Sequence, residues 1–443
     1  MGERGTSVID PPIIGLIGIG VLILLILLGV PIAVSSSVVG FVGCIVLLGL
    51  KPALGVMYTI PIDKVATYSL SVIPLFILMG GFALYGGIGH ELYAACVRWL
   101  GRFPGGLAIA TTAANALFGA CSGSSLAAAA TFTKLSVPEM ARYNYHPRLT
   151  LGVIAASGTM AAMIPPSGMM VVFCTFADVS LGKLLIAGII PGVLEAIAYM
   201  ISIYVRSRMN PKLGPRVEVR VSLRERLFAL RYLLTAAVVF LVLAGGIYLG
   251  VFSPTEGGAA GAFVIFLIVV SRRKLSWAGF MLSLRETVTT SALIFFIIVG
   301  AMVFAQFLAV SRLPHFFTVM VTKQAVPPLV VVVMIMGIYL FLGTFLDAVA
   351  MMALTLPILF PLTESLGING IWFGILVIKM TEIALITPPL GLNVYVVKGL
   401  APEGTRLEDI FAGIMPFLLM DIVTLALMIV FPQIVLWIPN TMG

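Results

Sequence analysis

Two apolar segments of the chain carry polar, glycine-rich and proline-rich interruptions in the same order. In the first segment Cys121–Ser125 precedes Ile164–Gly168, and in the second Gly343–Asp347 precedes Thr387–Gly391. The residues that recur at one constant interval are Pro138 and Pro361, Pro165 and Pro388, Pro166 and Pro389, and Gly168 and Gly391. Paired Gly/Pro interruptions at corresponding places in two apolar halves are typical of the binding sites of membrane transporters.

The Pro-Pro pairs indicate ion-binding chemistry. A proline removes one backbone donor and clashes with the preceding turn, so the carbonyl groups near Pro165 and Pro388 lose their helical partners. Such carbonyls and the C-terminal ends of half-helices are suited to Na⁺, whereas half-helix N-termini favour anions. Further polar groups come from Ser122, Ser124, Ser125 and Ser167 in the first segment and from Thr344, Asp347, Thr387 and Asn393 in the second.

Each of these features also has a purely structural interpretation. A Pro-Pro pair can simply kink a helix, and Ser and Gly allow helices to approach closely. Asp347 is a candidate ion ligand, but it is equally placed to cap the following helix. Because an interruption and a break are paired twice, we favour the functional interpretation.

The composition places the chain in a membrane. Sixty per cent of the residues are hydrophobic and 10% are charged, whereas soluble globular proteins carry about 25% charged residues. The net charge of +8 could suggest a nucleic-acid partner. However, the basic residues are concentrated in short loops between apolar stretches, which indicates membrane topology and no nucleic acid.

The apolar stretches predict the fold. A transmembrane helix needs about 20 apolar residues, and suitable stretches fall at 13–29, 31–50, 67–88, 149–178, 181–205, 229–250, 257–271, 288–310, 367–400 and 408–437. Two others, 104–142 and 326–362, have two apolar arms and a polar middle, which predicts re-entrant helical hairpins. Non-helical backbone at that depth is tolerated only inside protein or beside water. We expect an all-α polytopic protein of about ten transmembrane helices and two hairpins.

The basic residues predict the orientation. If the Arg-rich loop 206–231, which includes Arg220, is cytoplasmic, most of the 26 Lys and Arg residues also fall on that side. The positive-inside rule is satisfied only if both hairpins return to the side from which they start. The first hairpin then enters from the cytoplasm and the second from outside. The two repeats are therefore inverted, and both termini, with Arg4 near the first, are expected to be periplasmic.

Few charged residues lie within the predicted spans, and each of them needs a partner. Lys379 and Glu382 are three residues apart on one helix face, so we expect them to pair with each other rather than with substrate. Glu195 and Asp421 occupy comparable places in the last span of each half and are expected to meet across the fold.

The ordered set of motifs resembles the large membrane subunit of tripartite ATP-independent periplasmic (TRAP) transporters. The matching segments are Ile73–Gly80, Ser122–Ser125, Pro138–Met140, Ile164–Ser167, Thr255–Glu256, Leu342–Asp347 and Ile386–Asn393. They span nearly the whole chain, apart from the first dozen residues and the loop 206–231. The resemblance implies Na⁺-driven secondary uptake of a small organic acid across the bacterial inner membrane. It also implies a periplasmic substrate-binding protein and a small membrane subunit as a separate chain.

The resemblance further implies an elevator-type division of the chain. Scaffold helices are expected at 1–100 and 232–325, transport-domain segments at 101–205 and 326–443, and a basic cytoplasmic loop at 206–231. Two Na⁺ sites are implied, at Ser122, Gly123, Ser124 and Pro165, and at Gly343, Thr344, Asp347, Thr387 and Pro388. The anionic substrate is expected between them, at Ser125, Ser167 and Asn393.

Several alternatives remain open from the sequence. A self-sufficient Na⁺- or H⁺-coupled carboxylate carrier would share this architecture without needing a binding protein. A passive channel would also use polar re-entrant tips. An intramembrane enzyme is disfavoured, because Ala120–Gly123 lacks the first glycine of a G-x-S-G site and there is no H-E-x-x-H motif. Loop 206–231 could bind anionic lipid, but we favour ordinary positive-inside bias as its explanation.

Overall fold

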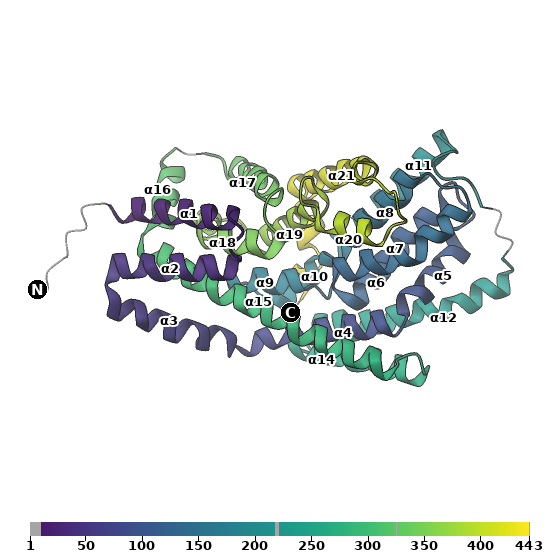
Figure 1. Ribbon diagram of the computed structural model, residues 1–443, viewed down its shortest axis with the longest axis horizontal. Coiled ribbons are helices and arrows are strands. Elements are labelled where there is room, and N and C mark those ends of the chain that lie inside the picture. Colours follow the sequence, from purple (N-terminus) through teal and green to yellow (C-terminus); the bar gives the residue numbers. More distant parts are fainter. Residues whose placement is uncertain (1–9, 218–220, 325, 443) are drawn as a thin grey trace, which may run out of the picture.

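A computed structural model describes residues 10–217, 221–324 and 326–442, and in these ranges the chain forms helices and connecting turns without a strand. Arg4, Arg220 and the ends of the predicted terminal segments lie outside the described residues. The predicted all-α fold is confirmed in the described part of the chain, and the elements are seen in Figure 1.

The N-terminal part forms five helices before the first hairpin. They are α1 (Pro11–Leu27), α2 (Ile32–Leu48), α3 (Leu50–Val65), α4 (Val72–Tyr85) and α5 (Ile88–Leu100), with a 3₁₀ turn at Tyr68–Ser71. The sequence analysis placed no span at the positions of α3 and α5, and the structure has helices there. Both lack a run of 20 apolar residues: α3 contains Pro52 and Pro61, and α5 is strongly amphipathic, with Glu91 and Arg98.

The first predicted hairpin and broken span are present. The hairpin arms are α6 (Gly106–Ser122) and α7 (Ser125–Arg142), joined at Gly123-Ser124. The broken span consists of α8 (Pro147–Thr159) with a 3₁₀ turn at Met160–Ala162, an irregular stretch containing Pro165-Pro166, and α9 (Gly168–Ala177). It is followed by α10 (Leu181–Ala187) and α11 (Ile189–Met209).

The second half repeats this order. It begins with α12 (Leu223–Phe240), which continues through a π-helical stretch at Leu241–Gly245 into α13 (Gly246–Tyr248), followed by α14 (Pro254–Ser271), α15 (Trp277–Val310) and α16 (Leu313–Lys323). The second hairpin consists of α17 (Pro328–Gly343) and α18 (Ala348–Ser365), and the second broken span of α19 (Gly370–Ile386) and α20 (Leu392–Leu400). The chain ends with α21 (Leu407–Val430), α22 (Gln433–Leu436) and a short 3₁₀ turn at Pro439–Thr441.

Two helices begin earlier than apolar composition predicts, because polar capping residues start them. α12 begins at a capping box in which Ser222 accepts from the Glu225 backbone and the Glu225 carboxylate accepts from the Ser222 backbone. α15 begins after Ser276, whose hydroxyl accepts from the Gly279 backbone N–H at 3.0 Å. Capping satisfies the first orphan donors of a helix, so a helix can extend beyond the apolar span. The early start of α15 places Arg285 within the helix.

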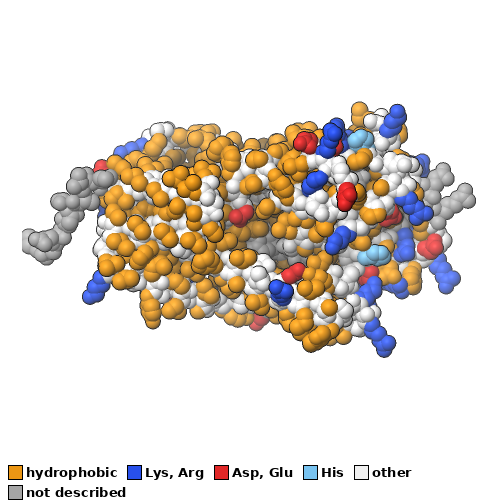
Figure 2. All heavy atoms as spheres, in the orientation of Figure 1, with side chains coloured by type: hydrophobic (Ala, Val, Ile, Leu, Met, Phe, Trp, Pro, Cys, Tyr) orange, Lys and Arg blue, Asp and Glu red, His pale blue; other side chains and the backbone are white. Residues whose placement is uncertain are grey.

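The described helices meet the length and apolarity that a membrane requires. The long apolar ones are Tyr68–Tyr85, Leu181–Met209, Leu223–Tyr248, Pro254–Ser271, Trp277–Val310, Ala348–Ser365 and Leu407–Val430. Shorter apolar helices include α1, α2, α6, α9 and α17. Figure 2 shows hydrophobic side chains over most of the visible face, with Lys and Arg gathered toward the right-hand end. Such a surface is suited to lipid rather than water.

The two hairpins lie in different parts of the molecule. In Figure 1 the base of the first hairpin is toward the right, near α5, and the base of the second is toward the left, near α16. Both tips are directed toward the middle. A side-chain hydrogen bond joins the two arms of each hairpin. Thr111 donates to Ser136 at 3.1 Å in the first, and Thr355 donates to the Tyr339 hydroxyl at 2.6 Å in the second. This arrangement brings each tip to a broken span.

Candidate functional site

The tip of the first hairpin touches the first break. Gly123 ends α6 in the left-handed region, with φ +60°, and a Cβ atom there would lie 2.6 Å from the Pro166 carbonyl oxygen. Only glycine combines that φ with so close an approach at little cost. The tip of the first hairpin therefore contacts the first break at Pro166, and the ion site at Ser122–Ser125 and Pro165 stays a prediction.

Ser124 and Ser167 are helix caps at this meeting point. The Ser124 hydroxyl accepts from the Ala127 backbone N–H, and that of Ser167 accepts from the Met170 backbone N–H, both at 3.3 Å. Ser167 also donates to the Ala162 carbonyl at 2.5 Å. Helices α7 and α9 therefore both begin at this meeting point. The partial positive charge at a helix N-terminus favours an anion.

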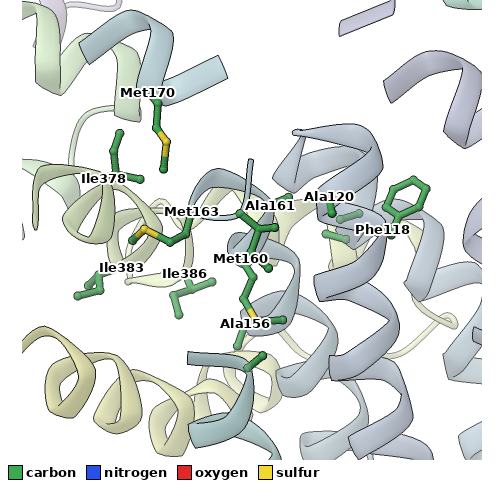
Figure 3. Packing of buried hydrophobic residues seen from close by; sticks show 14 of the residues in the cluster. Phe118, Ala120, Ala156, Met160, Ala161, Met163, Met170, Ile378, Ile383 and Ile386 are labelled. Atoms are coloured by element: carbon green, nitrogen blue, oxygen red, sulfur yellow. The ribbon is translucent and has the colours of Figure 1, made fainter. Parts of the chain in front are cut away.

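The first tip and break are enclosed. Ser122, Ser125, Pro165 and Ser167 are all buried, and the Ser122 hydroxyl has no hydrogen-bond partner there. Figure 3 shows Met160, Ala161 and Met163 of the break between Phe118 and Ala120 of the first hairpin and Ile378, Ile383 and Ile386 of α19. The apolar faces of the two repeats thus hold the first break in place.

The second tip and break also meet, in a more open setting. A Cβ atom on Gly343 would lie 2.6 Å from that of Ala384, near the end of α19. A cavity of about 30 Å³ lies between Leu346–Ala348, Ala384–Leu385 and Leu390–Leu392. Asp347, Pro388 and Leu390 are exposed, in contrast to the buried residues of the first pair.

The polar side chains of the second pair bond mainly to their own helices. Asp347 caps α18, accepting from the Val349 and Ala350 backbone N–H groups at 3.0 Å each. Thr344 donates to the Phe341 carbonyl at 2.7 Å, and Thr387 to the Ile383 carbonyl at 2.6 Å. The capping interpretation of Asp347 is therefore confirmed, while its second carboxylate oxygen can still face a ligand.

Asn393 links the two repeats. It is buried at the start of α20, and its amide donates to the Ala155 carbonyl of α8 at 3.2 Å, while its carbonyl oxygen has no partner in the described part of the chain. Asn115 on α6 has the same character: its amide donates to Ser157 of α8 at 2.6 Å and its own oxygen is unpartnered. Our sequence analysis missed Asn115, although a lone amide in an apolar hairpin arm was the available signal. Both amides bond to α8 shortly before the first break.

A buried cluster of charged side chains joins α11, α19 and α21. The Lys379 ammonium is 2.6 Å from Glu195, 2.8 Å from Asp421 and 3.1 Å from Glu382, and all four side chains are inaccessible. Tyr199 donates to Asp421 at 2.6 Å. The predicted Lys379–Glu382 pair is confirmed, and Glu195 and Asp421 meet across the fold as expected, with Lys379 between them.

The carbonyl and hydroxyl oxygens at the tips and breaks are suited to a weakly bound hard cation. Among the described residues there is no cluster of three or more His, Cys, Asp or Glu side chains suited to a metal ion. Carbonyl and hydroxyl oxygens at the tips and breaks are ligands of the kind that alkali and alkaline-earth cations accept. The two Na⁺ sites remain predictions.

Substitution of Gly123 by alanine should disrupt the first site. The added methyl would meet the Pro166 carbonyl, and the left-handed backbone would cost about 1–2 kcal/mol by itself. We expect a lower melting temperature in thermal unfolding and reduced uptake. Gly168→Ala is the matched control at the same break, because no atom lies within 4 Å of its added methyl. Equal behaviour of the two variants would show that the tip does not need to touch the break.

Comparison with known proteins agrees with the geometry. The family model "Tripartite ATP-independent periplasmic transporter, DctM component" matches residues 19–434. The chain is 34% identical over 377 residues to the C4-dicarboxylate TRAP transporter large permease protein DctM of Pseudomonas aeruginosa, covering 85% of this chain and 87% of that protein. It is 30% identical over 374 residues to the sialic acid TRAP transporter large permease protein SiaM of Vibrio cholerae, covering 84% and 86%.

The fold also has a solved counterpart. The YdaH transporter of Alcanivorax borkumensis, whose crystal structure is described as revealing an unusual topology, superposes with a TM-score of 0.60 at 14% identity, covering 86% of this chain and 88% of that one. At this identity the likeness supports the fold alone. The relatives are transporter permeases, which excludes the enzyme alternative. Since the family model covers most of its length, the chain belongs to the DctM-component family of TRAP transporters.

Proposed function

We propose that this protein carries out Na⁺-coupled secondary uptake of a small organic acid across the bacterial inner membrane. The observation that carries the proposal is the pairing of each hairpin tip with a broken span, through Gly123 with Pro166 and Gly343 with Ala384. Each pair offers carbonyl and hydroxyl oxygens for a cation, and α7 and α9 offer N-termini for a carboxylate.

The proposed substrate position is between the two pairs. Ser125, Ser167, Asn393 and Asn115 supply hydroxyl and amide groups there, and the Asn393 and Asn115 oxygens are unpartnered. A small anion with hydroxyl or carboxyl groups would use such groups. Relatives are named for C4-dicarboxylate, sialic acid and isethionate, so the proposed class is a small organic acid.

The proposed partners follow from the family. We propose a periplasmic binding protein that delivers the substrate and a small membrane subunit that is a separate chain. A relative from Oleidesulfovibrio alaskensis, the isethionate TRAP transporter permease protein DctMQ, is longer than this chain, which covers 65% of it. By contrast, relatives named large permease are covered over most of their length.

The proposed movement is of elevator type, with the two hairpins and broken spans carried as one unit. Helix α2 packs along α15 so closely that a Cβ on Gly300 would lie 2.3 Å from the Ala33 carbonyl oxygen, as expected of a rigid scaffold. The first hairpin tip rests on α4, where a Cβ on Gly80 would lie 2.5 Å from the Ser122 carbonyl oxygen. This contact joins the proposed transport unit to the proposed scaffold, and it would have to change when the unit moves.

Uptake of labelled organic acids into proteoliposomes tests the proposal. The vesicles would contain this chain with its small subunit, with or without the binding protein and with or without an inward Na⁺ gradient. We expect uptake only when both the Na⁺ gradient and the binding protein are present. Na⁺-driven uptake without the binding protein would favour the self-sufficient carrier, and uptake without any gradient would favour a channel.

Asp347 allows its capping role to be separated from an ion-binding role. Asn caps a helix about as well as Asp, whereas Ala loses about 1 kcal/mol of capping energy. We expect Asp347→Asn to retain the wild-type melting temperature but to need several-fold more Na⁺ for half-maximal uptake. Asp347→Ala should have both a lower melting temperature and a higher Na⁺ requirement. Normal Na⁺ dependence in Asp347→Asn would leave Asp347 with a capping role alone.

A further inference from the structure

The buried cluster around Lys379 contains more negative than positive charge. Three carboxylates, from Glu195, Glu382 and Asp421, surround one ammonium group, and none of the four side chains is accessible. If all were ionised, two negative charges would be uncompensated in the interior of a membrane protein. Buried charges are tolerated only when they are paired and hydrogen-bonded, and otherwise such groups become neutral.

The hydrogen bonding of the cluster is also incomplete. Among the described residues, the buried oxygens without a donor are Oε1 of Glu195, Oε1 of Glu382 and Oδ2 of Asp421, while Oε2 of Glu195 lies 2.6 Å from the Lys379 ammonium. Glu195 and Glu382 both contact the Lys379 ammonium, which brings a hydrogen bond between their carboxyl groups within reach. Two ionised carboxylates cannot form that bond, since neither has a hydrogen atom to donate. One added proton would supply the missing donor and remove one of the uncompensated charges.

The contacts of each carboxyl group identify where the proton resides. Asp421 accepts both from Lys379 at 2.8 Å and from the Tyr199 hydroxyl at 2.6 Å, so its ionised form is stabilised. Glu195 is 2.6 Å from the ammonium group, the shortest of the three ion pairs. Glu382 is the most distant, at 3.1 Å, and its Oε1 is free to carry hydrogen.

Ionisable side chains face Glu382 from each of the three helices that form the cluster. Glu195 and Tyr199 face Glu382 from α11, Lys379 from α19 itself and Asp421 from α21. A metal ion is disfavoured at this position, because the Lys379 ammonium already occupies the centre of the three carboxylates.

We propose that this cluster is a proton-binding site, in which a proton on Glu382 is shared with Glu195 at neutral pH. On release the proton would pass to solvent and leave Glu382 as a carboxylate beside Glu195. Like charges at such short range repel strongly in a low-dielectric interior.

The site is placed to affect both breaks. Glu382 lies about one turn before Ile386 and Thr387, at the second break. Glu195 is on α11, and Gly188 just before this helix and Gly192 within it pack on the first break. A Cβ on Gly188 would lie 2.3 Å from the Met163 carbonyl oxygen, and one on Gly192 2.5 Å from Ile164. The proton therefore holds helices of the two repeats together, and its loss at alkaline pH should slow transport.

Infrared spectroscopy of the purified chain tests the proton directly, without relying on the proposed function. We expect a protonated-carboxyl C=O band at neutral pH in the wild type that is absent in Glu382→Gln. Asp347→Asn, which removes an exposed carboxylate, is the matched control and should retain the band. Identical spectra for the wild type and Glu382→Gln in this region would overturn the proposal.

Uptake assays test the consequence, and this arm rests on the proposed function. Gln mimics protonated Glu, so Glu382→Gln should keep neutral-pH uptake within about twofold of wild type, whereas Asp421→Asn, which removes a required charge, should lose at least about tenfold. At alkaline pH the wild type should slow while Glu382→Gln does not. A parallel alkaline decline in both would overturn the proposed role.

Two further outcomes separate the possibilities. If Glu382→Gln fails to fold while Glu195→Gln or Asp421→Asn behaves like wild type, the proton is not on Glu382 and the proposal is wrong. If wild-type vesicles show no uptake at all, the proposed function fails, but the infrared band still decides whether the proton is present.

Discussion

Replacement of Lys379 by methionine should be among the most destabilising single changes in this protein. Methionine fills a similar volume but leaves Glu195, Glu382 and Asp421 without their shared cation. Removing one partner of a buried ion pair costs about 3–5 kcal/mol, because the remaining charge stays buried and uncompensated. We expect a strongly reduced melting temperature, or loss of folded protein, in detergent-solubilised samples.

Lys183→Met is the matched control for this prediction. Lys183 is exposed near the start of α10 and makes no salt bridge within the described part of the chain. Exposed substitutions of this kind usually change stability by less than about 0.5 kcal/mol. If Lys379→Met melted at the same temperature as Lys183→Met, the cluster would contribute nothing to stability beyond ordinary packing.

Gly413→Val should separate two helices that are now in backbone contact. A Cβ on Gly413 of α21 would lie 2.0 Å from the Arg148 carbonyl oxygen, and one on Gly152 of α8 would lie 2.4 Å from the Gly413 carbonyl oxygen. Backbone atoms cannot move aside as a flexible side chain can, so α21 and α8 must part. We expect a loss of about 3 kcal/mol or more, at the upper end of the cost of overpacking.

The contact of α8 with α21 also matters for function, because it joins the first broken span to the last long helix of the second repeat. The melting temperature of Gly413→Val and its rate of uptake should therefore both be lower than those of the wild type. Gly337→Val is the control: Gly337 lies within α17 and is exposed, and among the described residues no atom lies within 4 Å of an added Cβ. Similar stability of the two variants would mean that the close packing of α8 on α21 is dispensable.

Much of the fold was predictable because its signals are local. Apolar length predicts spans, and the Gly/Pro interruptions predict hairpins and broken helices, since a proline disrupts a helix whatever surrounds it. Other local signals were present but unused. The Ser222–Glu225 capping box marks the start of α12 six residues before the predicted span at 229.

Two of the helices without a predicted span lack the apolar run that marks a transmembrane helix. α5 has an amphipathic face with buried residues, and tertiary packing of such a face, rather than propensity, supplies most of the stability of a helix of this kind. α3 contains Pro52, Pro61 and charged residues, and Ala53 is its one buried residue. Apolar counts therefore do not detect them.

The sequence by itself determined the membrane class, the duplicated order of hairpin and broken span, and the residues Ser122–Ser125, Pro165, Gly343–Asp347 and Pro388 as site candidates. Only the tertiary structure decided which of these residues meet. It placed Gly123 against Pro166, enclosed the first site while leaving Asp347 exposed, and gathered Glu195, Glu382 and Asp421 around Lys379. The reason is that helix breaks are encoded within a few residues, whereas burial and charge pairing depend on helices far apart in the chain.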